Sequence, residues 1–552
     1  MMKSLRLAAT LLASAITLCV HAQQSRTDSL KRAESELRHR YDNVQQQRKL
    51  LSVFNYLSNM YVDQTDMSPL VERAIVAMLE ELDPHSSYIS AKDMKGVREQ
   101  FDGEFSGIGI EFNVHRDTIL VINVIAGAPA ESAGIRPNDR IVDIDGQSAT
   151  GISRNDVTAK LRGPTGSKVS VGIRRHGIGE LLEFEIVRGK IPINTVDAAY
   201  LIDEKTGYIK VNRFGHTTMS EFESAAEKLG NTDALIVDLR GNGGGIMEQA
   251  VKMAEYFLPE GALIVSTEGA NVKSQHFEAR RNGAFTTGRA VILLDSSSAS
   301  ASEIVAGALQ DWDRAAIIGV PSFGKGLVQR QVALPDSSAV RITVSRYHTP
   351  TGRVIQRPYE NGKRNEYYLA HRQRMLRSQA DSLADDGRPE YKTLRTGRTV
   401  YGGGGITPDI IVEADTTLVT DCILKLTAKG VVVDFLYNYL DRSRDSLAML
   451  YDDFGKFDRE FAVAGPTLDE FFAAAAEKGI ECSEEERPRT ERFVKRFIKA
   501  YAARTLFSNS EYVRVLNEND DPVYRTAVET ILDPEKMKSL LTAADNKNTR
   551  QE

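Results

Sequence analysis

The sequence predicts a multidomain α+β protein built around an α/β core, with helical segments at both ends. Residues 234–239 and 290–294 are apolar runs, each followed by a segment with helical spacing, which is typical of buried strands in a mainly parallel, layered sheet. Residues 104–188 contain short strand-like runs between glycine and proline turns. Residues 50–78 and the chain after residue 415 carry apolar side chains at helical spacing.

The bulk composition allows several domains and favours no charged partner. The chain has 552 residues, of which 41% are hydrophobic and 26% charged, and its formal net charge is −6, which is ordinary for a globular domain protein. This charge gives no reason to expect nucleic acid or an anionic membrane as a general partner. The three cysteines, Cys19, Cys422 and Cys482, indicate neither a disulfide framework nor a zinc site. We expect no metal and no cofactor.

The first 22 residues are typical of a secretory signal. Lys3 and Arg6 form a basic start, residues 7–20 an apolar stretch, and VHA a small-residue cleavage site. The stretch is shorter than a membrane-spanning helix, so we expect cleavage, no integral membrane span, and export, to the periplasm in a two-membrane bacterium. A lipoprotein acylated at Cys19 is the alternative, which the bulky Leu18 disfavours.

Changes of pattern along the chain give the expected domain boundaries. In order, we expect a signal peptide at 1–22, an N-terminal helical region at 23–100, a small β-rich domain at 101–188, an α/β core at 189–415 and a helical extension at 416–552. Within the core, residues 356–400 are polar and lack a clear period, and we interpret them as a surface insertion. The extension has three amphipathic helix candidates, at 461–478, 491–501 and 521–532.

The domain at 101–188 has the strand and helix order of a peptide-binding module. Two strand-like runs between residues 107 and 125 precede the phrases GAPAESAGI and DRIVDIDG. This order resembles a PDZ domain. The resemblance implies that an extended C-terminal peptide adds to the sheet as a strand, while backbone amides of a glycine-rich loop hold its carboxylate. That loop would contain Gly107, Ile108 and Gly109; a small structural β-domain without a ligand is the alternative.

Ser300 has the position of a catalytic nucleophile. It follows the buried run 290–294 and directly precedes a helix predicted over 303–310. At such a turn the hydroxyl is presented at a strand end, where the first amides and the positive end of the helix face a developing oxyanion. The alternative is that Ser300 or Ser302 only caps the helix, as serines commonly do.

Lys325 could supply the base that a serine nucleophile needs. It stands between Gly324 and Gly326 in an otherwise apolar stretch, where burial would lower the lysine pKa and leave a neutral amine. A phosphate-binding role is disfavoured because no GxxxxGK[ST] sequence leads into a helix. Gln329 could orient the amine. A straight strand would place it about 13 Å away, at about 3.3 Å per residue, so contact requires the chain to curl at a glycine.

The glycine run that follows the first buried strand offers backbone donors for an oxyanion. An amide of this run, from Gly244 or Gly245, and the amide of Ala301 would form an oxyanion hole. The alternatives are a plain strand-to-helix turn and a dinucleotide loop, whose glycine spacing the run does not match. His348 is the nearest alternative base, for a Ser–His mechanism, but no GxSxG sequence accompanies it.

Six phrases besides the PDZ segment occur in the order found in one family. Across about residues 50–415 the chain resembles the carboxyl-terminal processing (tail-specific) protease family, which are PDZ-containing serine endopeptidases. The phrases are LDPHS at 82–86, DLRGNGGG at 238–245, SASASEI at 298–304, FGKGLVQ at 323–329, TPTGR at 349–353 and GITPD at 405–409.

The resemblance implies a fold and a role for each site residue. Ser300 would be the nucleophile, Lys325 the general base and Gln329 its orienting partner, with oxyanion donors at Ala301 and at Gly245 or Gly244. It also implies a crotonase-like spiral core, and a PDZ domain that gates the active site, with Arg162 reporting ligand occupancy. Nothing transfers to the 356–400 insertion or to the extension after residue 415.

The expected function is therefore an exported serine endopeptidase with a Ser–Lys dyad that cleaves proteins near their C-terminus. Its partners would be proteins or peptides with exposed C-termini, and its helical ends are compatible with a homodimer or a regulatory partner protein. The alternative is a proteolytically silent PDZ scaffold that binds or delivers C-terminal peptides. The joint presence of Ser300, Lys325 and Gln329 disfavours it, because a silent scaffold needs none of them.

Overall fold

The chain divides into two compact units, residues 1–78 and 79–552. The computed structural model describes residues 38, 41–115, 117–376, 387–413 and 419–542, so the expected signal peptide and Cys19 lie outside the described residues. In the first unit, residues 41–60 are helical and α2 (Met67–Glu80) begins, as the apolar spacing predicted. No helix in the described ranges is long and apolar enough to cross a membrane.

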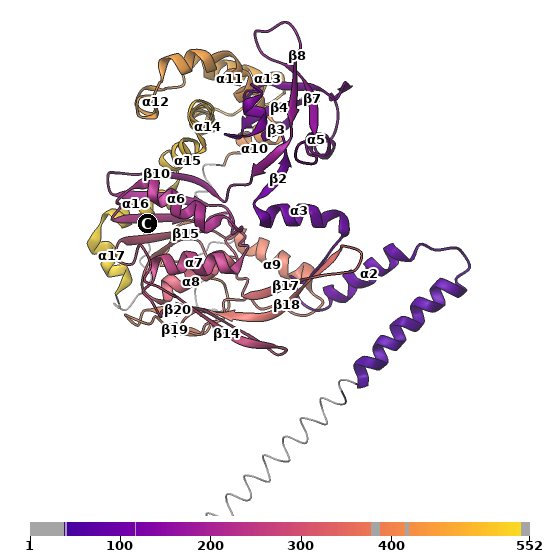
Figure 1. Cartoon of the computed structure of the whole chain (residues 1–552). Coiled ribbons are helices and arrows are strands. Elements are labelled where there is room, and N and C mark those ends of the chain that lie inside the picture. The colour runs from indigo at the N-terminus through magenta and orange to yellow at the C-terminus, as the bar shows by residue number, and fades with distance from the viewer. Residues whose placement is uncertain (1–37, 39–40, 116, 377–386, 414–418, 543–552) are drawn as a thin grey trace, which may run out of the picture. The chain divides into compact units, whose positions relative to one another are not determined.

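The centre of the second unit is a six-stranded sheet with the order β10-β11-β12-β15-β16-β21. All neighbours are parallel except β10 and β11. The strands are β10 (Val196–Leu201), β11 (Thr206–Val211), β12 (Ala234–Asp238), β15 (Arg289–Leu294), β16 (Ala316–Gly319) and β21 (Ile410–Ile411). The connections between them contain α6 (Thr218–Leu229), α7 (Met247–Phe257) and α8 (Ala301–Asp311) (Figure 1). The predicted layered α/β core is confirmed.

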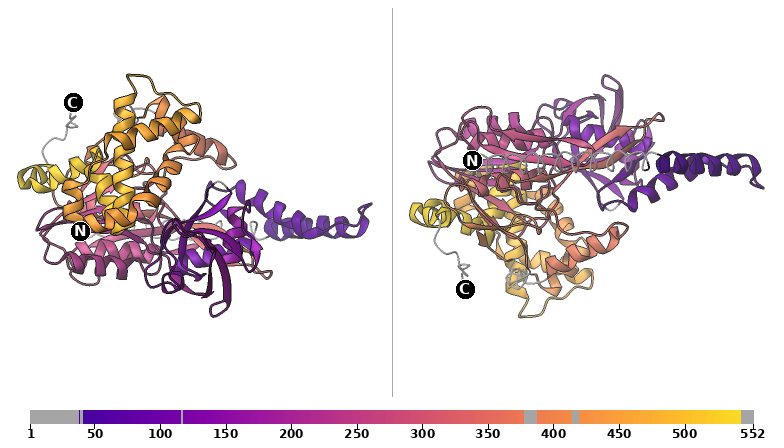
Figure 2. Two further views of the ribbon diagram at one scale, coloured as in Figure 1. Left: turned by 90° about the horizontal axis from the view of Figure 1, so that it is seen from above. Right: turned by 90° about the horizontal axis from the view of Figure 1, so that it is seen from below.

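Both faces of this sheet are buried, which explains why its central strands are continuous apolar runs. One face packs against α6, α7 and α8 in a cluster that includes Leu235, Ile292 and Phe222. The other face packs against α16 (Pro522–Leu532) and α17 (Pro534–Leu541), the yellow helices of Figure 2. Ile236 on the sheet and Ile531 on α16 belong to this second cluster. The C-terminal extension therefore completes the hydrophobic core of the α/β domain.

A second sheet holds the segment that carries Lys325. Its strand order is β1-β18-β13-β14, with β17 paired to β18, and all pairings are antiparallel. The strands are β1 (Ser87–Ile89), β13 (Leu263–Gly269), β14 (Val272–Glu278), β17 (Leu327–Ala333) and β18 (Ala339–His348). Because β1 follows the LDPHS turn directly, that turn is tied into the same sheet as the lysine segment.

Residues 104–192 form a small β-domain with its own apolar core. β2 (Glu104–Gly107) pairs with β9 (Gly189–Pro192) and closes the domain, just after α3 (Ala91–Asp102). Its main sheet follows the order β3-β4-β5-β7-β8, with β6 beside β5. The elements are β3 (Ile110–His115), β4 (Thr118–Val124), α4 (Pro129–Ser132), β5 (Arg140–Ile144), β6 (Gln147–Ser148), α5 (Arg154–Leu161), β7 (Lys168–Arg174) and β8 (Leu182–Val187).

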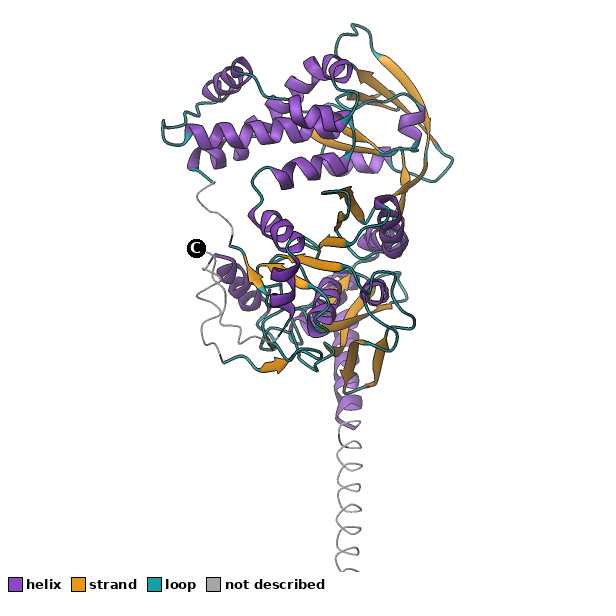
Figure 3. Ribbon diagram, turned by 90° about the vertical axis from the view of Figure 1, so that its left-hand side faces the viewer, coloured by secondary structure: helices purple, strands orange, loops and turns teal. Residues whose placement is uncertain are grey.

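The C-terminal extension contains helices and no strand in its described residues, 419–542 (Figure 3). The helices before α16 are α10 (Asp421–Ala428), α11 (Val431–Leu450), α12 (Phe454–Glu460), α13 (Gly465–Glu477), α14 (Arg487–Leu506) and α15 (Asn509–Glu518). Cys422 and Cys482 form a disulfide with Cα atoms 5.3 Å apart. The cysteine count had indicated no disulfide framework; the fold brings together two cysteines that are 60 residues apart in sequence.

The segment at 356–400 is more regular in structure than its polar composition indicated. It contains α9 (Arg364–Leu376) and a hairpin of β19 (Glu390–Lys392) and β20 (Thr399–Tyr401). Arg398, only 3% exposed, pairs with Asp313 at 2.7 Å and with Asp409 at 2.6 Å. Most of the other described side chains of the segment are exposed or half-buried, so the segment lies at the surface and is joined to the core by these charged contacts.

Candidate active site

The carboxyl ends of β12 and β15 bring two loops of the site together. Asp238 at the end of β12 stands opposite Leu293 of β15, so the loops that follow leave the parallel sheet at the same edge. One loop contains the glycine run, and the other ends at Ser300. Asn242 joins them, because its carbonyl accepts the Ala299 N–H at 3.0 Å and the Ser302 hydroxyl at 2.9 Å.

Ser300 occupies a strained turn between β15 and α8. Its backbone has φ +55° and ψ −109°, a conformation that costs an L-residue about 1–3 kcal/mol. A serine on a sharp strand-to-helix turn presents its hydroxyl at the sheet edge. Gly244 makes this turn sterically possible, since a Cβ added there would lie 2.9 Å from the Ser300 Cβ. Ser300 is half-buried and is also the N-cap residue of α8, so one residue has both the capping position and the position at the cavity.

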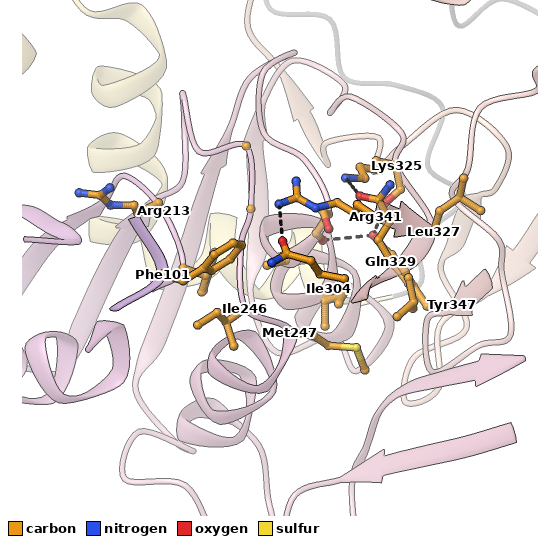
Figure 4. Close-up of a pocket in the computed structure, with 18 of the residues that line it drawn as sticks. Phe101, Arg213, Ile246, Met247, Ile304, Lys325, Leu327, Gln329, Arg341 and Tyr347 are labelled. Atoms are coloured by element: carbon orange, nitrogen blue, oxygen red, sulfur yellow. Dashed lines mark hydrogen bonds between the residues drawn. The ribbon is translucent and has the colours of Figure 1, made fainter. Parts of the chain in front are cut away.

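Lys325 lies in the loop before β17 and faces the same cavity as Ser300. The two side chains line a cavity of about 550 Å³, and Figure 4 shows Lys325 beside Gln329 in it. Lys325 Nζ donates to Gln329 Oε1 at 2.9 Å. The chain between them is not a straight strand, because β17 has an irregularity in its pairing between Val328 and Gln329. No hydrogen bond joins Lys325 Nζ to the Ser300 hydroxyl among the described residues. The structure thus brings the lysine and the glutamine into contact and places the serine beside them.

The environment of Lys325 favours its neutral form. Burial lowers the pKa of Lys325 below its ordinary value of 10.5, and the positive charge of Arg341 lowers it further. The carboxylates of Glu303 and Asp83 raise the pKa of Lys325, but by less than burial and Arg341 lower it.

Gln329 is held by the LDPHS turn, a contact that the sequence did not reveal. Its Nε2 donates to the His85 carbonyl at 2.6 Å. The Asp83 carboxylate accepts the backbone N–H groups of His85 at 2.9 Å and Ser86 at 3.0 Å, which shapes the turn. Tyr368 of α9 donates to the Pro84 carbonyl at 3.2 Å, so the insertion supports the same turn. Burial lowers the pKa of His85 to about 4, which leaves its ring neutral.

Glu303 connects the turn at Ser300 with the loop that carries Lys325. One carboxylate oxygen accepts the backbone N–H groups of Ser300 at 2.7 Å and Lys325 at 2.9 Å. The other accepts the Ser322 hydroxyl at 2.5 Å and the Gly324 N–H at 2.7 Å. Glu303 is fully buried; burial raises its pKa, and the four donors oppose that effect. Sequence reasoning missed this role, and the only signal was the position of Glu303 within the phrase SASASEI.

Tyr347 makes a second connection between the same two segments. Its hydroxyl lies 2.8 Å from the Lys325 carbonyl and 3.1 Å from the Ser300 carbonyl. The side chain is 1% exposed, and burial raises its pKa, so the phenol keeps its proton for these acceptors. Ser300 and Lys325 are therefore connected through both their N–H and their C=O groups.

Two of the three predicted oxyanion donors are free in the described structure. The backbone N–H groups of Gly245 and Ala301 have no acceptor among the described residues. The Gly244 N–H donates to Asn242 Oδ1 at 2.9 Å, so Gly244 is not available, which corrects that expectation. Position 245 requires glycine, since its φ is +146° and an added Cβ would lie 2.1 Å from the Phe214 carbonyl oxygen.

The predicted peptide site of the small β-domain is a groove between β3 and α5. Gly107, Ile108 and Gly109 line it, and its volume is about 430 Å³. Gly109 has φ +84°, and an added Cβ would lie 2.2 Å from the Ala128 Cβ, so the loop requires glycine there. Arg162 also lines the groove. Its guanidinium pairs with Glu99 of α3 and lies 4.2 Å from the centre of the Phe105 ring.

His348 does not lie at the candidate site. Its Nδ1 is 3.2 Å from the Gly352 carbonyl oxygen and its Nε2 is 3.7 Å from the Glu268 carboxylate. It is not among the described residues that line the cavity of Ser300. The structure gives no support to a Ser–His arrangement.

Four stretches of the chain match known protein families. Residues 205–361 match Peptidase family S41, and residues 120–175 match the PDZ domain. Residues 9–93 match the activating protease CtpB N-terminal domain, and residues 423–508 match a family of unknown function.

Curated relatives from several bacteria match slightly more than half of this chain. The chain is 38% identical over 311 residues to a carboxy-terminal-processing protease of Bartonella bacilliformis, which covers 55% of this chain and 71% of that protein. It is 35% identical over 312 residues to the carboxy-terminal processing protease CtpA of Bacillus subtilis, covering 56% and 66%. The solved photosystem II D1 C-terminal processing protease is 30% identical, covers 55% of this chain and 82% of that chain, and has a TM-score of 0.32. The chain belongs to the carboxy-terminal processing proteases, serine peptidases of family S41.

Proposed function

We propose that this family member hydrolyses peptide bonds near protein C-termini through a Ser300–Lys325 dyad. The observation that carries the proposal is that both side chains line one cavity while Glu303 and Tyr347 connect their backbones. Such connections keep a nucleophile and a base in a constant relation, which is what covalent catalysis by an otherwise weak nucleophile requires.

In the proposed mechanism the neutral Lys325 amine takes the proton of Ser300 as the hydroxyl attacks the scissile carbonyl. One amine hydrogen is bound by Gln329 Oε1, so the nitrogen lone pair remains for the serine proton. The backbone N–H groups of Gly245 and Ala301 stabilise the oxyanion. Lys325 then gives the proton to the leaving amine, and a water molecule hydrolyses the acyl-enzyme.

We further propose that the PDZ groove binds the C-terminal tail of the substrate. The loop Gly107, Ile108 and Gly109 offers backbone amides at one end of the groove, the chemistry that holds a terminal carboxylate. The Arg162–Glu99 pair connects the groove to α3, whose residue Phe101 lines the catalytic cavity. This connection supports a role for Arg162 in coupling tail binding to catalysis.

We also propose export, on the basis of the basic and apolar N-terminal segment and of the Cys422–Cys482 disulfide. Disulfides persist in oxidising compartments outside the cytoplasm. Residues 1–30 fused to a reporter enzyme should carry it out of the cytoplasm, and retention of the fusion inside would contradict export.

Loss of either dyad residue should abolish cleavage while the fold remains. An unstructured reporter with an apolar C-terminal tail should be cleaved by the wild type, and Ser300→Ala and Lys325→Ala should each lower kcat/KM by about a thousandfold or more. A reporter without the tail should have a higher KM. The exposed Arg346→Gln serves as the control. A serine-reactive fluorophosphonate that fails to label the wild type would favour the silent-scaffold alternative, and cleavage by Ser300→Ala would overturn the nucleophile assignment.

Activity should rise with pH as Lys325 loses its proton. The protonated amine cannot act as a base, and the pKa of Lys325 is lowered by burial and by Arg341 against the opposing charges of Glu303 and Asp83. The acid limb of a kcat/KM profile should therefore lie below pH 10.5, the ordinary lysine value. The profile is measured on an uncharged peptide. A limb at or above pH 10.5, or a rate that falls as pH increases toward that value, would contradict the neutral-base mechanism.

Replacement of Glu303 by glutamine should impair both catalysis and stability. One carboxylate oxygen becomes an NH₂ group, so two of its four donors lose their acceptor. Each unsatisfied buried donor costs about 1–3 kcal/mol. We expect kcat/KM to fall at least about tenfold and the free energy of unfolding, measured in urea, to fall by about 2 kcal/mol or more. Glu227→Gln, exposed on α6, should change neither. Wild-type values for Glu303→Gln would refute the connecting role.

A further inference from the structure

The catalytic cavity contains cations but no carboxylate among its described lining residues. Its charged side chains are Lys325, Arg213 and Arg341, and the remaining lining residues are polar and uncharged or apolar. If Lys325 is neutral, the two guanidinium groups determine the charge of the cavity. A cavity lined by fixed positive charge attracts anionic groups of a ligand.

Arg341 of β18 has weak polar contacts for a partly buried cation. Its Nη2 lies 3.4 Å from Gln331 Oε1, and its guanidinium carbon lies 6.0 Å from the centre of the Phe101 ring. No described carboxylate forms an ion pair with it. Burial lowers the pKa of Arg341, which reflects hydration that is lost without a compensating charge. In Figure 4 its guanidinium lies between Phe101 and Lys325.

Three largely buried arginines of the core have carboxylate partners, whereas Arg314 donates to backbone carbonyls and Arg357 lies over aromatic rings. Arg240 contacts Asp238 at 2.7 Å, Arg353 contacts Asp311 at 2.6 Å and Arg398 contacts Asp313 at 2.7 Å. A desolvated cation without such a partner is costly. Arg341 differs from these three arginines because it faces the cavity in which a substrate would lie, so a substrate carboxylate can serve as its missing partner.

The position of Arg341 indicates which part of the substrate it would meet. Lys325 returns its proton to the leaving amine, so the residues after the scissile bond lie on the Lys325 side of the cavity. Arg341 acts electrostatically on Lys325. Arg213, in contrast, immediately precedes Phe214, which pairs with Gly245 of the oxyanion loop. Arg341 is therefore the guanidinium on the leaving-group side.

Resting on the proposed function, we propose that Arg341 binds a carboxylate of the released C-terminal fragment. The preferred substrates would carry, within a few residues after the scissile bond, either an acidic side chain or the free C-terminus of the chain itself. Both sources present the same planar carboxylate, which a guanidinium binds through paired, charge-assisted hydrogen bonds.

Two families of matched, internally quenched peptides test the proposal and separate the two sources. In the first, aspartate replaces asparagine at each of three positions after the scissile bond, with an amidated C-terminus throughout. In the second, an uncharged leaving fragment of three residues ends in a free or an amidated carboxyl group. Wild type should cleave the carboxylate member of at least one pair with about tenfold higher kcat/KM, the effect of one charge-assisted hydrogen bond. Preference in only one family identifies the source.

Variants on one strand assign the preference to Arg341. Arg341→Gln should bring the ratio of kcat/KM values to about 1 while it still cleaves the uncharged peptides, and Arg341→Lys should retain most of the preference. Arg346→Gln removes the same charge from β18 outside the cavity and should leave the ratio unchanged. Because Arg341 also lowers the pKa of Lys325, each enzyme is assayed at a pH above its own acid limb.

The outcomes separate this proposal from the proposed function. A wild-type ratio near 1, or a preference that persists in Arg341→Gln, overturns the carboxylate site while cleavage of uncharged peptides leaves the Ser–Lys mechanism intact. Failure of the wild type on every peptide contradicts the proposed function itself. If Arg341→Gln is inactive on all peptides, the wild-type ratio at rising salt decides: a ratio that decreases supports the ionic contact, and a constant ratio overturns it.

Discussion

The candidate active site depends on one buried carboxylate that joins two segments of the chain. Glu303 lies in the first turn of α8, three residues after Ser300, and accepts four hydrogen bonds, two of them from the backbones of Ser300 and Lys325. Burial of a carboxylate is unfavourable, and only this number of donors makes it tolerable. Movement of one segment relative to the other would leave a buried donor or acceptor unpaired. The segments of Ser300 and Lys325 are therefore held in one relative position. Tyr347 adds the same constraint on the carbonyl side.

Segments outside the shared family region also support the site. Tyr368 of the insertion bonds the LDPHS turn, whose His85 carbonyl accepts the Gln329 amide. Asp521 of the C-terminal extension pairs at 2.7 Å with Arg240, which lies at the start of the oxyanion loop. The insertion and the extension are therefore built into the protease domain, and the extension covers an apolar sheet face that would otherwise contact water.

The charges in the cavity affect both the protonation state of Lys325 and the kind of substrate group that the cavity attracts. In the proposed mechanism the lysine base must be neutral, and both burial and the neighbouring positive charge of Arg341 lower its pKa. The same charge, on Arg341, lacks a carboxylate partner among the described residues and faces the space for a substrate. Under the two proposals, the guanidinium of Arg341 both lowers the pKa of the base and selects the leaving fragment.

The amino-acid sequence by itself determined the layered α/β core, the order of strands and helices in the PDZ domain, and the candidate catalytic residues. Apolar runs of strand length and glycine-bounded turns are local signals, so they can be recognised without knowledge of the fold. Ser300, Lys325 and Gln329 could be named because each sits in a distinctive local phrase. Only the tertiary structure decided that Gly244 is already bonded to Asn242, that Glu303 joins the two catalytic segments and that Cys422 meets Cys482. Most of these contacts join residues that are distant in the sequence. Which groups meet depends on how the chain folds and on which groups become buried, and no local sequence pattern contains that information.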